Sequence, residues 1–143
     1  MNQSEKRLFL IQSLLKENPA YRDWSVPQDA DDQKRLLRGL MNVRPAQNSS
    51  AEFLKIQDEY LREVTAQKGV TDADSLSPVQ PGICLWQGDI TTLHCDAIVN
   101  AVNSGMTGCY VPNHRCIDNA IHTFAGVELR LACEELMEQQ GYP

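Results

Sequence analysis

The sequence predicts an α/β protein in which a helical segment precedes the first part of a sheet domain. Up to residue 69, apolar residues recur at helical spacing. Residues 70–81 then gather proline, serine and aspartate, as linkers do. Short continuous apolar runs follow, the pattern of strands covered on both faces of a parallel sheet. We therefore expect a helical N-terminal extension (1–69), a linker (70–81) and an α/β segment (82–143).

Three amphipathic helices are expected before the linker, at residues 4–17, 29–42 and about 50–68. Asn18 and Pro19 end the first, because proline cannot continue a helix. An acidic first turn favours the second through the helix dipole, and Ser49 with Glu52 forms a candidate capping box for the third. Their charged residues are most simply a solvated face. A docking surface for a protein partner is the functional alternative.

Two apolar runs after the linker, 83–86 and 97–99, are predicted to be strands. One long amphipathic helix is expected to start near Cys116 and to bury a single face, made of Ile117, Ala120, Ile121, Phe124, Val127 and Leu131. Open α/β sheets bind ligands at the carboxyl ends of their strands. That rule places a group of polar residues in a ligand site: Asn100, Asn103, Asp118 and Asn119.

The loop before this helix has the donor atoms of a zinc site. Cys109, His114 and Cys116 offer two thiolates and an imidazole, and three protein ligands leave the fourth tetrahedral position open for water or substrate. A proline–asparagine pair between Cys109 and His114 favours a turn that brings them together. The alternative is two buried cysteines and a surface histidine, because short Cys/His patterns also arise by chance.

The neighbouring polar residues also have purely structural explanations. Asp89 follows a glycine and suits a turn, and Asn100 and Asn103 suit the ends of strands. Asp118 would lie in the first turn of a helix, where an acid is stabilised in any case. His122 lies four residues later on the same helix face and can bond to Asp118. Their functional value therefore depends on their combination.

Composition restricts the class of partner. The formal net charge is -6, with 13 basic and 19 acidic residues, and the basic residues are scattered along the chain. No nucleic-acid or membrane partner is expected from this pattern. The N-terminus has no signal-peptide pattern and its apolar run, residues 8–11, is too short for a membrane span. Together with the odd number of cysteines, this favours a reducing cytoplasm.

Three ordered motifs resemble the macrodomain, and specifically its zinc-containing branch of microbial protein-ADP-ribose hydrolases. They are Gly88-Asp89-Ile90, the Asn-Ala-Val-Asn run at 100–103 and the stretch 109–122. The resemblance covers residues 82–143, and the helices before them resemble the N-terminal extension of that branch. It implies a three-layer α/β/α fold whose sheet is incomplete here. We therefore expect a truncated form with unpaired strand edges and poor solubility or partial folding.

The resemblance also implies roles for individual residues. Asp89 would accept the adenine amino group, Asn103 would bind the distal ribose, and Asn103 and Asp118 would be catalytic. The residues implied for ADP-ribose binding are Asp89, Ile90, Asn100, Asn103, Ile117, Asp118 and Asn119. The ligands implied for Zn²⁺ are Cys109, His114 and Cys116. Many macrodomains have a glycine-rich stretch in place of this Cys/His loop, so a metal-free mechanism need not transfer.

The reaction implied is zinc-dependent removal of ADP-ribose from mono-ADP-ribosylated protein, a glycosidase-type cleavage at the anomeric carbon of the ribose. Zinc would lower the pKa of a bound water or orient the ribose hydroxyls, and Asp118 would act as general base or position the water. The alternatives are a reader that binds ADP-ribose without cleavage, and an inactive fragment that acts through its helical segment. The implied partners are a sirtuin-like ADP-ribosyltransferase and a lipoyl-carrier protein related to the glycine-cleavage H protein.

Overall fold

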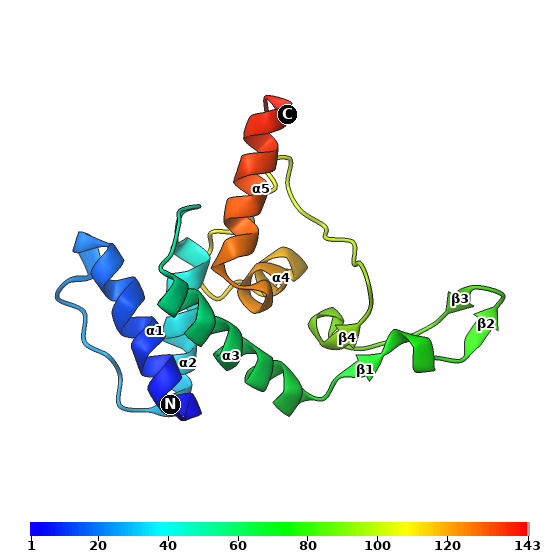
Figure 1. The fold of residues 1–143 in the computed structure, drawn as a ribbon, viewed down its shortest axis with the longest axis horizontal. Coiled ribbons are helices and arrows are strands. Elements are labelled where there is room, and N and C mark those ends of the chain that lie inside the picture. The colour runs from blue at the N-terminus through cyan, green and yellow to red at the C-terminus, as the bar shows by residue number, and fades with distance from the viewer. Residues whose placement is uncertain (143) are drawn as a thin grey trace.

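A computed structural model describes residues 1–142 and has a mixed α/β fold (Figure 1). Within these residues the α-helices are α1 (Gln3–Glu17), α2 (Ala30–Val43), α3 (Ala51–Lys68), α4 (Ile117–Ala125) and α5 (Val127–Gln140). The 3-10 helices are η1 (Pro19–Tyr21), η2 (Ala73–Ser75) and η3 (Ile90–Thr92). The strands are β1 (Thr71–Asp72), β2 (Pro78–Gln80), β3 (Ile83–Cys84) and β4 (Leu93–His94). The three helices expected before residue 69 are confirmed.

The caps of the first three helices explain where they begin. The Asp29 carboxylate accepts from the backbone N–H groups of Asp31 and Asp32 in the first turn of α2. At α3 the expected cap was wrong by one residue. Ser50 is the cap and accepts from the Phe53 N–H at 3.1 Å. The Ser49 hydroxyl is instead taken by the Arg44 guanidinium, which donates to it at 2.8 Å.

The hydrophobic core lies among α1, α2 and α3, which pack side by side (Figure 1). Leu10 and Ile11 of α1 are fully buried there. Each buried side chain of this size stabilises the fold by about 1.5–3 kcal/mol. Val127 of α5 belongs to the same cluster, and α4 packs on α2 and α3. Helices α4 and α5 therefore pack on the helical segment.

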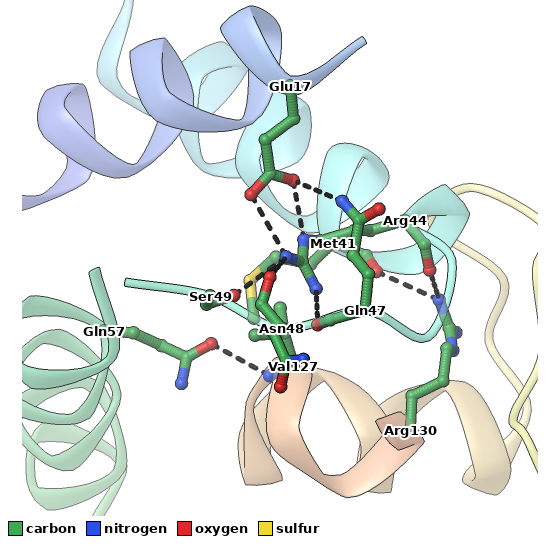
Figure 2. Close-up of polar contacts among 9 residues, drawn as sticks. All are labelled: Glu17, Met41, Arg44, Gln47, Asn48, Ser49, Gln57, Val127 and Arg130. Carbon is green, nitrogen blue, oxygen red and sulfur yellow. Dashed lines mark hydrogen bonds and ion pairs between the residues drawn. The ribbon is translucent and has the colours of Figure 1, made fainter. Parts of the chain in front are cut away.

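The single long helix expected from Cys116 is in fact two helices that meet at Gly126. Gly126 has φ of +89°, and a Cβ there would collide with the Gln57 side chain. The side-chain amide oxygen of Gln57, Oε1, accepts from the Val127 N–H at 2.9 Å, and Figure 2 shows this bond. The buried Gln57 amide therefore packs at the junction where α4 ends and α5 begins. Ile117, expected in the buried face, is 39% exposed at the start of α4.

The expected parallel sheet of the runs 83–86 and 97–99 is not formed. β3 pairs antiparallel with β2 in an exposed hairpin that projects from the helices (Figure 1), whereas the parallel pair is β1 with β4. Residues 97–99 form no strand. A strand needs a neighbour for its backbone N–H and C=O groups, and within residues 1–142 the 97–99 run has no strand beside it. Every helix in the described residues is too short or too polar to cross a membrane.

Candidate functional site

The Cys/His loop brings its three candidate ligands together. The ligand atoms of Cys109, His114 and Cys116 all lie within 4.8 Å of one another. Cys109 Sγ is 3.5 Å from His114 Nδ1. Tetrahedral zinc, with bonds of about 2.3 Å to sulfur and about 2.05 Å to nitrogen, separates such a pair by about 3.6 Å. The donor set and its spacing therefore fit a zinc ion.

The expected turn between Cys109 and His114 is confirmed. Asn113 adopts the left-handed conformation at φ +55°, which asparagine tolerates better than most residues. The His114 N–H donates to the Val111 carbonyl at 3.2 Å and closes the turn. The chain therefore reverses direction here and returns the imidazole to the first cysteine.

Asp118 lies buried at the start of α4 beside the loop. One oxygen, Oδ1, accepts from Asn100 Nδ2 at 2.8 Å and lies 3.5 Å from His122 Nε2. Burial lowers the pKa of His122, although the nearby Asp118 carboxylate opposes the shift. The imidazole is therefore neutral at pH 7. The structure thus brings together two of the predicted site residues, Asn100 and Asp118.

The ring of His122 also fixes the path of the loop. Gly108 has φ of +90°, and a Cβ at this position would lie 2.8 Å from His122 Cγ. Only glycine allows both this conformation and this close approach. The neutral imidazole is thus in contact with the loop just before Cys109.

Asp89 is a separate, exposed acceptor near the end of α3. The Thr91 hydroxyl, which donates to Asp89 at 2.7 Å, is the largest cause of a lowered pKa, and the Thr91 N–H and Lys68 act in the same direction. The carboxylate is therefore ionised at neutral pH and can only accept hydrogen bonds. Ile90 begins η3, which packs between α3 and α4.

Asn103 and Asn119 are held by contacts inside the chain. The exposed Asn103 side chain accepts from the Gly105 N–H at 2.9 Å. The Asn119 side chain is buried, accepts from Arg38 and donates to the Val111 carbonyl at 3.1 Å. Its N–H donates to Cys116 Sγ at 3.4 Å. Among residues 1–142, Asn103 has no hydrogen bond to Asp118 or to residues 109–116.

Comparison with known proteins agrees with the motifs. The macro domain family model matches residues 99–143. Residues 99–143 are therefore similar to part of a macro domain. A protein-ADP-ribose hydrolase from Treponema medium is 57% identical over 146 residues, which cover 99% of this chain and 56% of that protein. A protein of the same name from Staphylococcus aureus (strain MRSA252) is 48% identical over 134 residues, or 93% of this chain and 50% of the relative.

A third relative, from Fusarium oxysporum f. sp. cubense, has the name "Probable bifunctional ADP-ribose hydrolase/ADP-ribosyltransferase". It is 44% identical over 117 residues, which cover 74% of this chain and 20% of the relative. The chain spans about half the length of the first two relatives. The similarity to the hydrolases extends through the helices as well as the macro domain part.

Three residues outside the predicted site contact the stretch 107–114, which includes most of the Cys/His loop. Arg38 and Asn42 of α2 bond to the loop at His114 and Asn113. Arg130 of α5 bonds to it at the Thr107 carbonyl. Sequence reasoning missed all three. The spacing of Arg38 and Asn42, four apart on one helix face, was the available signal, but it does not say what that face contacts.

Proposed function

We propose that the chain belongs to a hydrolase that removes ADP-ribose from mono-ADP-ribosylated protein. The similarity to protein-ADP-ribose hydrolases over nearly the whole chain carries this proposal. The geometry is compatible with it, because a cluster with three metal-ligand atoms runs directly into the helix that begins with a buried acid. The helical extension at 1–69 and the macro domain part from 82 onward would act as one unit.

Zn²⁺ is the proposed cofactor, with Cys109, His114 and Cys116 as its ligands. Two thiolates and an imidazole are a donor set that zinc favours over harder cations. When bound with an open fourth position, zinc would act as a Lewis acid on an oxygen of the water or of the distal ribose.

Asp118 is the proposed proton acceptor. Asn100 donates to the carboxylate and the neutral His122 lies against the same oxygen, so the carboxylate is held in one orientation. In the proposed reaction it takes a proton from the attacking water or positions that water. Asn103 is the second proposed catalytic residue, because its amide can both donate to and accept from ribose hydroxyls.

The proposed ADP-ribose site extends from Asp89 to the start of α4. The ionised Asp89 would accept a hydrogen bond from the adenine amino group, with Ile90 beside the ring. The backbone N–H groups of Ile117 and Asp118 at the start of α4 would favour an anionic part of the ligand. Asn119 would contribute indirectly, because its side chain is already bonded within the loop.

An ADP-ribosyltransferase is the proposed functional partner. The name of the Fusarium relative joins the two activities in one protein, which favours a transferase that supplies the modified substrate. A sirtuin-like transferase, a lipoyl-carrier substrate and a cytoplasmic location remain predictions from the sequence.

Metal analysis with ADP-ribose calorimetry and a hydrolysis assay tests the proposal. We expect about one zinc per chain, which is lost in Cys116→Ala but retained in Cys84→Ala, where the cysteine is exposed in β3. Asp118→Asn is expected to retain zinc and ADP-ribose but to lose turnover. Binding without turnover in the unaltered protein would favour a reader. Absence of zinc from soluble protein would reject the metal centre.

A further inference from the structure

The Cys/His loop depends on contacts outside itself for its shape. Residues 95–116 contain no helix or strand. A segment of this length without regular hydrogen bonding populates many conformations unless other parts of the fold hold it. Metal ligands on such a segment converge only where their backbone is fixed. The contacts that α2 and α5 make with the loop therefore decide whether the three ligands are preorganised.

Arg38 of α2 bridges the loop and the helix that follows it. Its Nη2 donates to the His114 carbonyl at 3.1 Å and to Asn119 Oδ1 at 2.8 Å. Its Nε also donates to Asn119 Oδ1, at 3.2 Å. A planar guanidinium fixes the direction of each bond more firmly than a flexible ammonium would. One side chain thus holds the backbone of a candidate ligand residue and the first turn of α4 at once.

Asn119 extends this constraint to Cys116, at the C-terminal end of the loop. With Oδ1 held by Arg38, its Nδ2 points to the Val111 carbonyl, to which it donates at 3.1 Å. The Asn119 N–H donates to Cys116 Sγ at 3.4 Å. Amide hydrogen bonds of this kind orient a thiolate ligand from outside its coordination sphere.

Asn42, one helical turn after Arg38, holds the tip of the loop. Its Oδ1 accepts from the Asn113 N–H at 2.9 Å, and its Nδ2 donates to Thr123 Oγ1 of α4 at 3.0 Å. Between them, Gly39 lets the loop approach closely, because a Cβ there would lie 3.1 Å from Asn113 Nδ2. Gly39 and Asn42 therefore form one surface of α2 that packs closely against the turn at Asn113.

Arg130 of α5 links the segment before Cys109 to the C-terminus of α2. It donates to the Thr107 carbonyl at 2.7 Å and stacks over the Tyr110 ring at 4.1 Å. It also donates to carbonyls at the C-terminus of α2, including that of Arg44 (Figure 2). The positive charge suits this end of a helix, where unpaired carbonyls gather.

The C-terminus of α2 is itself anchored. The Arg44 guanidinium pairs with Glu17 of α1 at 2.7 Å and bonds to the α2–α3 connection at Gln47, Asn48 and Ser49 (Figure 2). The surface that contacts the loop is therefore part of a fixed frame. It is not a free helix face.

We infer that the surface of α2 sets the conformation of the Cys/His loop, as a template for it. Arg38 is then a positioning residue, which holds His114 and the start of α4 so that the two thiolates and the imidazole converge. The inference rests on the proposed metal centre. It gives the helical extension a direct part in the site. The sequence alone favours a solvated face for its charged residues, with a docking surface for a protein partner as the alternative.

Zinc affinity, measured by competition with a chelator, tests the inference. Arg38→Met is expected to weaken zinc binding by about 10–100-fold, as loss of an outer hydrogen-bond partner does. Arg38→Lys keeps the positive charge but loses the planar set of N–H donors, and is also expected to weaken zinc binding. Arg35→Met is the matched control, because Arg35 lies on the exposed side of the same helix. In the cobalt-loaded protein, both Arg38 variants should shift the ligand-field bands, whereas the control should not.

Hydrogen exchange on the metal-free protein separates this inference from the metal proposal. We expect Arg38→Met to speed exchange of the amides at 109–116 while the amides of α1 keep their protection. If the unaltered protein binds no zinc, the metal centre fails, and faster exchange confined to the loop still supports the template. If Arg38→Met, Arg38→Lys and Arg35→Met share the same zinc affinity and loop exchange, the template is overturned and the metal centre stands. Should Arg38→Met fail to fold, Arg38→Lys decides by the same readouts.

Discussion

The helices α1–α3 and the segment 78–99 both contain apolar side chains but bury them to opposite degrees. Leu10 in α1 is 1% exposed, whereas Leu85 and Val99 in the later segment are 83% and 93% exposed. A helix satisfies its backbone hydrogen bonds internally and needs a partner only for its apolar face. A strand needs neighbours for its backbone as well.

The difference shows which residues after the linker are stabilised by contacts with α1–α3. Among the described residues, α4 and α5 make buried hydrogen bonds to the helical segment, through Gln57, Asn42 and Arg130. The Cys/His loop bonds to α2 through part-buried contacts such as that of Asn113 with Asn42. The β2–β3 hairpin makes no such contact within residues 1–142. Contacts with the helical segment therefore stabilise the proposed metal site, although its residues lie in the stretch that the macro domain model matches.

The largest expected effect comes from the matched pair Leu10→Ala and Leu85→Ala. Leu10→Ala should lower the free energy of unfolding by about 2–5 kcal/mol, because it leaves a cavity in the core. Leu85→Ala should change it by less than about 0.5 kcal/mol, because the side chain is already exposed. Denaturant unfolding followed by circular dichroism measures both. Equal losses in the two variants would show that segment 78–99 is packed in solution and would remove the contrast.

A smaller effect is expected at the junction between α3 and α5. Gln57→Leu removes the acceptor of the buried Val127 N–H and should cost about 1–3 kcal/mol of unfolding free energy. Gln67→Leu, on the exposed part of α3, is the control and should be nearly neutral. The same unfolding measurement applies. A neutral Gln57→Leu would mean that the helical segment and the later helices unfold separately.

The smallest effect is a pH dependence from His122. Burial holds its folded pKa below the ordinary value of 6.5, so the unfolded chain binds the proton more tightly. Its contribution to stability is complete above that value and is lost as the pH falls below it. In metal-free protein, His122→Gln should flatten the fall in unfolding free energy between about pH 7 and pH 5. An unchanged slope would show that His122 does not cause the pH dependence.

The parts that sequence reasoning predicted well are those set by local interactions. Helices α1 and α2 follow from apolar spacing and from residues such as Pro19 and Asp29 that lie at their ends. The turn at Asn113 was predicted for the same reason. The error at the start of α3 came from Arg44, a residue outside that helix, which takes the hydroxyl of Ser49.

The parts that could not be predicted depend on residues far apart in the chain. The break at Gly126 depends on Gln57, and the loop depends on Arg38, whose bond to Asn119 spans 81 residues. Nothing in the spacing of the motifs indicates these pairs. The strand at 97–99 failed for a related reason, because an apolar run specifies a strand only when a neighbour is present.

The bond between Asn42 and Asn113 has a consequence for biosynthesis, because it joins residues 71 positions apart. Chains are made from the N-terminus, and earlier units generally fold first. The surface of α2 is therefore synthesised, and its core with α1 and α3 can close, before Cys109 is added to the chain. Cys109, His114 and Cys116 are then added next to a helix surface that is already in place, so binding of the proposed metal would follow the folding of the helical segment and would not initiate it.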